Sequence, residues 1–260
     1  MFNILNLILM GGLAAFILID TLFPARSFAK TPFWRTRGVL AAAMYFALAT
    51  YAPFLWAGWF GEYRLIDATE LPLWLAAPLG YAVSQFFTYW WHRALHASDI
   101  LWRVFHQMHH SIERMDAWGA LYHSPLDIIG FTFMSGLALT IGIGLDPMAA
   151  AIAGVFGGFA VFFSHANIKT PQWIGHVMAR PEAHGLHHQR GRHAGNYGEL
   201  LLWDRLFGTW ENPREWNGPA GFYDGASTRV WEMLTFRDVT REPDRVDENQ
   251  KLQRGQLVSN

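Results

Sequence analysis

The chain has 260 residues, no cysteine, a formal net charge of −1 and 16% charged residues, fewer than the roughly 25% of a soluble domain. The lack of cysteine excludes disulfides, thiolate-ligated haem, cysteine-ligated iron–sulfur clusters and cysteine-containing zinc sites, and the absence of a basic stripe argues against nucleic-acid binding. With 52% hydrophobic residues, 13 Trp and 20 Phe, the composition is typical of a membrane protein.

Residues 4–23 predict the first membrane helix. Asp20 is their one charged residue, and as a helix they are long enough to cross a hydrocarbon core of about 30 Å. No lysine or arginine precedes Arg26, so this segment lacks the basic start of a signal peptide. We therefore expect it to be retained as a membrane anchor.

Charge then orients the chain. The loop at 24–37 is basic and contains no acid, whereas the loop at 61–70 contains three acids and one arginine. Because basic loops stay on the cytoplasmic side, the first loop should be cytoplasmic. A second span over 38–60 then runs outward and a third over 72–91 returns, so His92 should emerge in the cytoplasm.

A hydrophobic hairpin is predicted over 128–163. It consists of two uncharged runs separated by Asp146 and Pro147, each slightly short for a full span. Whether or not the hairpin crosses the bilayer completely, both of its ends stay on one side. His165 and the segment at 184–188 should therefore lie on the same side as His92.

Eight of the twelve histidines fall into three clusters, HRALH at 92–96, HQMHH at 106–110 and HGLHH at 184–188. Because a helix repeats every 3.6 residues, the histidines of each cluster should share one face and can clamp a metal ion. Imidazole suits iron, zinc and copper, and eight ligands exceed the roughly four of one tetrahedral ion. The pattern predicts a dinuclear site with the ligands His92, His96, His106, His109, His110, His184, His187 and His188.

The order HxxxH, HxxHH, hydrophobic hairpin, HxxHH resembles the fatty acid hydroxylase and sterol desaturase superfamily of integral-membrane di-iron oxygenases. The flanking sequences HHSIERMDAWGALYHSPLD and NYGELLLWDRLFGTW are also similar to that family, and the resemblance covers about 80–210. It implies the same eight ligands and adds His165, in SHAN, as a ninth. Where some members have a further histidine, this chain has Lys169, so His176 or water could take that place.

Two other histidines have less defined roles. His123, in YHSPLD, matches a position that the family often occupies, and it contacts either the metal, its ligands or the substrate. His193 is expected to be a surface residue or to contact the ligands from behind.

The resemblance implies two iron ions as cofactors, which zinc could replace in purified protein. It also implies O₂ as co-substrate and a lipid substrate such as a sterol, a fatty acyl chain or a sphingolipid. Hydroxylation is favoured over desaturation, although the boxes do not identify the lipid. Because the chain has no flavin or iron–sulfur motif, electrons must come from a separate reductase, ferredoxin or cytochrome.

Three other classes of protein fit the sequence less well. A membrane zinc hydrolase is an alternative, but the chain has no HExxH motif and so no adjacent glutamate base. A ferritin-like bundle would need carboxylate ligands. A non-enzymatic metal-binding membrane protein should place its polar residues within the spans, whereas here they lie outside them.

We therefore expect an all-α fold, a polytopic membrane helix bundle with a cytoplasmic histidine-rich di-metal helical cap. A single membrane oxygenase domain should cover 1–210, followed by a polar cytoplasmic tail at 211–260. The protein should be a multi-pass protein of a bacterial inner membrane, with its histidine boxes facing the cytoplasm.

Overall fold

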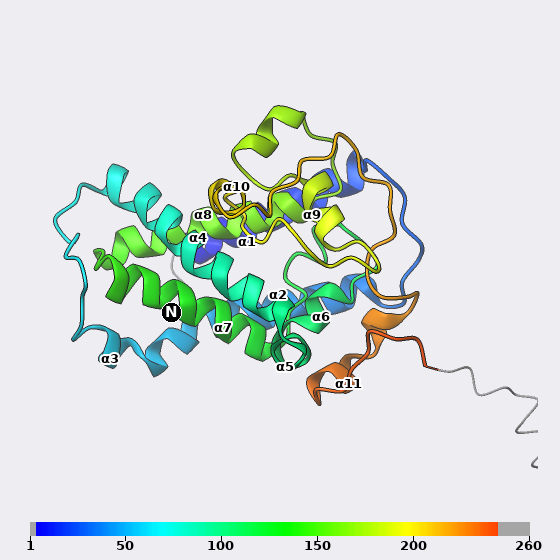
Figure 1. Cartoon of the computed structure of the whole chain (residues 1–260), viewed down its shortest axis with the longest axis horizontal. Coiled ribbons are helices and arrows are strands. Elements are labelled where there is room, and N and C mark those ends of the chain that lie inside the picture. Colours follow the sequence, from blue (N-terminus) through cyan, green and yellow to red (C-terminus); the bar gives the residue numbers. More distant parts are fainter. Residues whose placement is uncertain (1–3, 244–260) are drawn as a thin grey trace, which may run out of the picture.

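The computed structural model describes residues 4–243, and this part of the chain is helical, as expected (Figure 1). Its only β contacts are three isolated bridges between single residues. In chain order, the elements are α1 Ile4–Leu22, α2 Trp34–Tyr51, η1 Ala52–Leu55, α3 Ala57–Phe60, α4 Leu73–Ala97, α5 Asp99–Leu101, η2 Trp102–His106, α6 Gln107–His110, α7 Pro125–Gly136, η3 Leu137–Gly142, α8 Pro147–His165, η4 Gln172–His176, α9 Pro181–His187, α10 Leu202–Leu206, η5 Ala226–Thr228 and α11 Val230–Leu234.

Four helical stretches in the described residues are long and apolar enough to cross a membrane. They are Ile4–Leu22, Trp34–Leu55, Pro125–Gly142 and Pro147–His165, which correspond to the expected spans at 4–23 and 38–60 and to the expected hairpin. The span expected over 72–91 is a helix, α4, but it is not among the four. Its apolar run is interrupted by Ser84, Gln85 and Thr88.

The loop at 61–70 meets the turn that joins η3 to α8. The backbone N–H of Leu65 donates to the carbonyl of Ile141 at 2.7 Å, and Ala68 pairs with Leu145 in a short parallel bridge. The segments that carry the histidine boxes gather at the opposite end of the helices (Figure 1). The loop at 61–70 and the histidine boxes therefore lie at opposite ends of the bundle.

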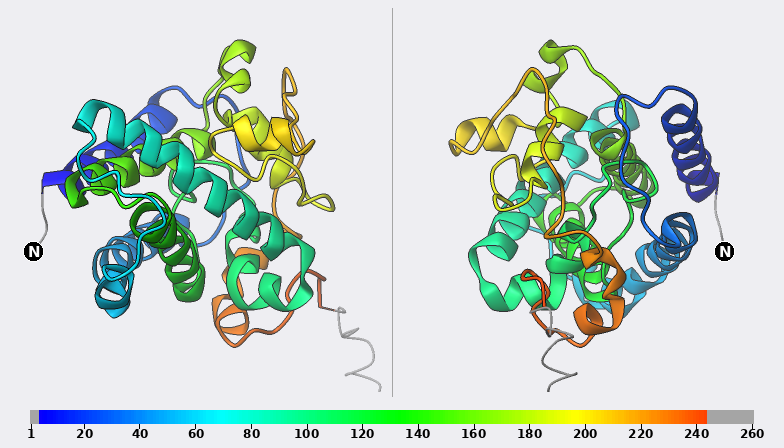
Figure 2. Two further views of the ribbon diagram at one scale, coloured as in Figure 1. Left: turned by 60° about the vertical axis from the view of Figure 1, so that its left-hand side comes forward. Right: turned by 90° about the vertical axis from the view of Figure 1, so that its right-hand side faces the viewer.

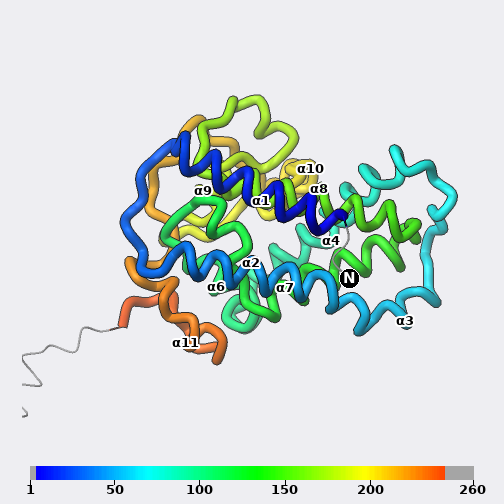
Figure 3. The backbone as a smooth tube through the Cα atoms, turned by 180° about the vertical axis from the view of Figure 1, so that it is seen from behind, coloured from blue at the N-terminus to red at the C-terminus, as the bar shows by residue number. Residues whose placement is uncertain are grey.

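Helix α8 is central to the bundle, because α1 and α4 both pack against it, while α2 packs against α7 (Figures 2 and 3). Small residues allow close contact: a Cβ atom at Gly12 of α1 would lie 2.5 Å from the ring of Phe159. Asp20, the charged residue of α1, is buried at the histidine end. Its carboxylate accepts hydrogen bonds from the backbone N–H groups of Ala117 and Asn167 and so anchors the end of α1.

Part of the segment that follows residue 210 packs against the helices. Trp216, Phe222 and Met233 are buried against Trp34 and Met108 in one hydrophobic cluster. Apolar residues spaced through the polar sequence after 210 thus close the histidine end of the bundle, so 211–243 belong to the same folded unit. Residues 244–260 of the expected tail lie outside the described residues.

Candidate metal centre

Five histidines form a first group in which one ring nitrogen of each lies within 4.8 Å of the others. The Nε2 atom of His92 lies 2.9 Å from Nε2 of His106 and 3.2 Å from Nε2 of His96. Nitrogens bound to one ion at 2.0–2.1 Å would be about 3.0–3.4 Å apart, so this group has the size of a coordination shell. Its members are His92, His96, His106, His110 and His187.

Four further histidines form a second group of the same size, His109, His165, His184 and His188. Nε2 of His184 lies 3.1 Å from that of His165 and 3.2 Å from that of His188. His109 completes the group, with its Nε2 atom 3.3 Å from that of His165. All four side chains are buried. The structure thus brings all nine histidines that the sequence singled out into two neighbouring groups.

Each HxxHH box contributes to both groups. The two histidines spaced four residues apart belong to one group, and the histidine between them belongs to the other, which is His109 in the second box and His187 in the third. The expectation that each box presents one shared face was therefore wrong, because a side chain one residue further along a helix points about 100° away. The rings of His110 and His188 stack at 4.1 Å, so the two groups adjoin.

Hydrogen bonds donated by Nδ1 atoms fix the ring orientations of the first group. The loop at 193–197 supplies three of the acceptors, all of them backbone carbonyls. Nδ1 of His92 donates to the carbonyl of Tyr197 at 2.6 Å, and Nδ1 of His96 donates to the carbonyl of His193 at 2.7 Å. Nδ1 of His187 donates to the carbonyl of Gly195 at 2.6 Å. A proton fixed on Nδ1 leaves the Nε2 lone pair free, so these rings are oriented to bind a cation.

Within the described residues, neither Asp204 nor Glu182 forms a hydrogen bond with a histidine ring. The Asp204 carboxylate accepts from the backbone N–H of Tyr197 at 2.7 Å, which positions the loop whose carbonyl groups hold the first group. Glu182 instead accepts from Thr170 and pairs with the buried Arg180. Both acids therefore stabilise the surrounding structure.

Asp127, in the first turn of α7, was missed by the sequence analysis. Its buried carboxylate accepts hydrogen bonds from Nδ1 of His106 at 2.9 Å and of His123 at 2.7 Å. His123 in turn stacks on His109, with ring centroids 4.0 Å apart. His123 thus lies beside the ligand candidates of both groups. His123 precedes the N-cap Ser124 and Asp127 lies in the first turn of α7, so the two side chains meet across the start of this helix.

Fewer Nδ1 atoms of the second group form hydrogen bonds among the described residues. His165 donates from Nδ1 to the carbonyl of Val161 at 2.9 Å, but the Nδ1 atoms of His109, His184 and His188 are buried with no hydrogen-bond partner among the described residues. In the first group, buried Nε2 atoms of His110 and His187 also lack a partner there. Because an unpaired buried polar atom is costly, the partnerless Nε2 atoms of the first group are suited to bind a cation.

The electrostatic environment keeps these imidazoles neutral. Burial lowers the pKa of His109, His110, His184, His187 and His188 well below the ordinary value, and the neighbouring histidines lower it further. Each buried ring avoids a charge that its neighbours would repel. Neutral imidazole is the form that ligates metal, so the sites are prepared for cations.

His176 and His193 belong to neither of the two groups. His176 is exposed and packs its ring against Trp210, so it does not take the place of the histidine that Lys169 replaces. His193 is half-buried, with its Nδ1 atom 3.0 Å from Nδ1 of His110. Its backbone carbonyl also holds His96, so it supports the first group from outside.

A family model described as fatty acid hydroxylase matches residues 77–209, just over half of the chain. Among curated proteins, the human alkylglycerol monooxygenase is 35% identical over 147 residues, which cover 55% of this chain and 31% of that protein. A sphingolipid C4-hydroxylase of Schizosaccharomyces pombe is 31% identical over 48% of this chain and 44% of its own length. An ornithine lipid hydroxylase of Rhizobium tropici is 30% identical over 55% and 44%, respectively.

The chain spans less than half the length of these relatives. No solved structure matches it. The matched region begins within α4 and ends just after α10, so it contains all three histidine boxes and the hairpin between them. The chain therefore belongs to the fatty acid hydroxylase family.

Proposed function

We propose that this protein is a membrane-bound di-iron oxygenase that hydroxylates a C–H bond of a lipid. The observation that carries the proposal is the pair of adjoining groups, five and four buried imidazoles, at one end of apolar helices. The similar proteins are named as monooxygenases or hydroxylases of lipids, which supports the same reaction class here.

The donor set suits iron. Nine neutral imidazoles would hold two ions, with His92, His96, His106, His110 and His187 around one and His109, His165, His184 and His188 around the other. When bound, the iron pair would supply the reduction of O₂ and the oxidation of the C–H bond. Converting R–H and O₂ to R–OH and water consumes two electrons and two protons. A separate reductase, ferredoxin or cytochrome would deliver the electrons.

The protein's own residues would exclude water and position the substrate. All nine histidines except His96 are buried, so the reacting centre is shielded from solvent. Phe131 of α7 lies against the first group, with its ring centroid 5.8 Å from His92 and 5.9 Å from His106. Because α7 is one of the apolar helices, this ring is placed to meet an apolar chain that arrives from the bilayer.

Two observations disfavour a zinc hydrolase. The two larger histidine groups contain no carboxylate among the described residues. Asp127 forms a third, smaller group with His106 and His123, and one of its carboxylate oxygens accepts hydrogen bonds from both histidines, so it orients imidazoles. A hydrolytic site would need a carboxylate free to act as general base on water.

The basic loop at 24–37 supports a cytoplasmic position for the histidine end, in a bacterial inner membrane. Asn167 accepts from the backbone N–H of Arg26, so this loop contacts the segment that follows His165. Loop and histidines therefore share one side. An electron donor on the cytoplasmic side would then reach the site without crossing the membrane.

The reaction class is tested with membranes that contain the protein, NAD(P)H, a competent reductase and, in separate assays, an alkylglycerol, sphinganine or an ornithine lipid. Hydroxylated product should form only in air, and under ¹⁸O₂ its hydroxyl should carry the heavy label. The variant His187→Ala should be inactive, whereas the exposed His176→Ala should remain active. Product that forms without O₂, or whose oxygen comes from water, would support the hydrolase or a hydratase instead.

A further inference from the structure

Two short helices at the side of the bundle expose large apolar side chains. They are η4 and α10. We define the apolar platform as residues 172–178 and 200–206, which contain these two helices and the residues that pair beside them. Its exposed residues are Trp173 (70%), Val177 (59%), Leu202 (51%) and Leu206 (66%). Such a patch on a protein surface marks a contact with something apolar.

The platform is a built surface. The backbone N–H of Leu201 donates to the carbonyl of Val177 at 3.1 Å, and Met178 pairs with Leu200 in an antiparallel bridge. The Arg205 guanidinium donates to the carbonyl of His176 at 3.2 Å, which joins α10 to η4. The four apolar side chains are therefore held outward by paired backbone.

The depth of the platform follows from its contact with α4. The Trp203 indole N–H donates to the carbonyl of Ala82 at 3.1 Å, and its ring lies 4.8 Å from that of Phe86. Ala82 and Phe86 precede His92 by ten and six residues, which in a helix is roughly 15 and 9 Å. Helix α10 thus lies well to the membrane side of His92, beside the middle of α4.

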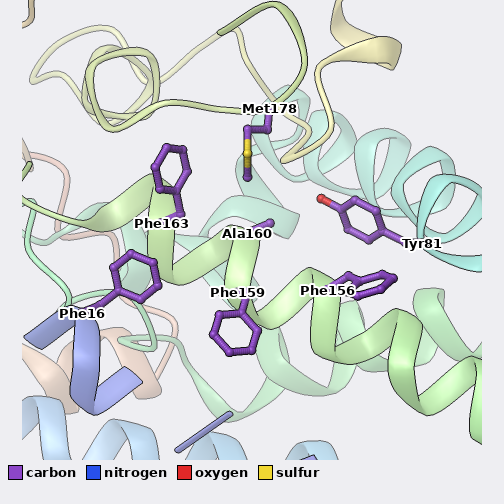
Figure 4. Close-up of a pocket in the computed structure, with 7 residues that line it drawn as sticks. All are labelled: Phe16, Tyr81, Phe156, Phe159, Ala160, Phe163 and Met178. Carbon is purple, nitrogen blue, oxygen red and sulfur yellow. The ribbon is translucent and has the colours of Figure 1, made fainter. Parts of the chain in front are cut away.

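An apolar groove of about 410 Å³ lies under the platform (Figure 4). Aromatic rings from α1, α4 and α8 line it, among them Phe16, Tyr81 and Phe163, and Ala160 lies between them on α8. Met178 of the platform covers one side. Two of the helices that line the groove, α1 and α8, are apolar enough to span a membrane.

We propose that the apolar platform lies within the lipid leaflet and that the groove beneath it holds an acyl chain of a membrane lipid. A lipid is the fitting occupant because the platform continues the apolar surface of α8, where Phe156 is also exposed. The contact between Trp203 and Ala82 also places the platform beside the middle of α4. The proposal places 172–178 and 200–206 in the membrane, whereas the sequence had placed the whole segment after the hairpin in the cytoplasm. It does not depend on the chemistry at the histidines.

Because the chain has no cysteine, single-cysteine variants can be spin-labelled one site at a time. Leu206→Cys and Trp173→Cys should be compared in phosphatidylcholine–phosphatidylglycerol nanodiscs with two controls. Leu40→Cys lies on an exposed face of α2, six residues or roughly 9 Å from the start of that helix, and Asp224→Cys lies on a side chain that is 88% exposed. Labels at 206 and 173 should collide more often with O₂, which enters the lipid, than with a nickel chelate, which stays in water. The label at 40 should show the same preference.

Labels at 206 and 173 that behave like the label at 224 would place the platform in water and overturn the proposal. Labels shielded from both reagents would show a second copy or another protein on this surface, which also contradicts it. The groove is tested by native mass spectrometry of lipid retained after purification. Ala160→Phe should lose retained lipid, and Gly154→Phe, which places a phenyl side chain in open space on the same helix, should keep it. Equal retention in both variants would overturn the assignment of the groove.

Discussion

The carboxylate of Asp127 accepts a hydrogen bond from Nδ1 of His106 at 2.9 Å. Through this bond α7, which starts two residues before Asp127, sets the orientation of a ring on η2. A carboxylate behind a metal-binding imidazole also raises its basicity. Asp127 is thus a positioning residue for the first group.

Replacing Asp127 with Asn should weaken metal binding at the first group by roughly 10–100-fold, because the imidazole loses its anionic acceptor. The measurement is metal content after dialysis against a graded chelator series. Asp67→Asn, at the opposite end of the bundle, is the matched control and should bind metal like the parent protein. Equal affinity in the Asp127 variant and the parent would show that the hydrogen bond has no role in metal binding.

Removing one ligand candidate from each group should empty that group. Gently purified protein should contain about two metal ions per chain, and His109→Ala and His187→Ala should each lower this number by about one. The number of metal ions per chain is measured by elemental analysis together with a protein assay. His176→Ala provides the exposed control. A metal content that neither His109→Ala nor His187→Ala changes would rule out the dinuclear assignment.

The two ions should leave the protein in two steps. Four histidines of the first group donate from Nδ1 to an oxygen acceptor, whereas among the residues that the structure describes only His165 of the second group does so. Because such acceptors raise affinity, the second group should lose its ion at a lower chelator concentration. Cobalt-substituted protein would show two separate absorbance changes during chelation. A single concerted change would contradict the difference between the groups.

Acid should destabilise the metal-free protein. The folded pKa values of His109, His110, His184, His187 and His188 lie well below 6.5, so the unfolded chain binds protons first as the pH falls. The stability that these neutral rings contribute is therefore present above pH 6.5 and lost below it. Thermal unfolding with chelator should give a lower Tm at about pH 5.5 than at about pH 8. A Tm that stays constant or rises on acidification would contradict this.

The histidine end should face the cytoplasm. A cytoplasmic reporter fused after residue 260 should be active in a bacterial host, and a periplasmic reporter at the same site should be silent, because the basic loop at 24–37 lies at that end. A fusion within 61–70, at the opposite end, should give the reverse pattern. An active periplasmic reporter at the C-terminus would contradict the proposed orientation.

The four apolar helices and the gathering of the nine histidines could be predicted because both signals are local. Apolar length predicts a helix such as α8, and spacings of three and four residues mark the boxes. The division of a box between two groups could not be predicted, since it depends on where α6 and α9 meet. The π-helical turn that ends at His106 also changes the register of the side chains that follow, and nothing in the sequence signals it.

The role of Asp127 and the packing of 211–243 were missed for a related reason. Asp127 acts on His106 across 21 residues, and Trp216 packs against Trp34 far back in the chain. A largely polar composition after residue 210 hid the few apolar residues that hold this segment in the core. Tertiary contacts of this kind leave no local pattern to read.

The sharing of each HxxHH box between the two groups has a consequence for biosynthesis. Neither group is complete until α9 has been made, because the first group needs His187 and the second needs His184 and His188. By the time α9 emerges from the ribosome, α7 and α8 have already emerged. Under the proposed assignment, metal insertion would therefore follow the emergence of the hairpin, and a nascent chain that stalls before α9 would have neither histidine group complete.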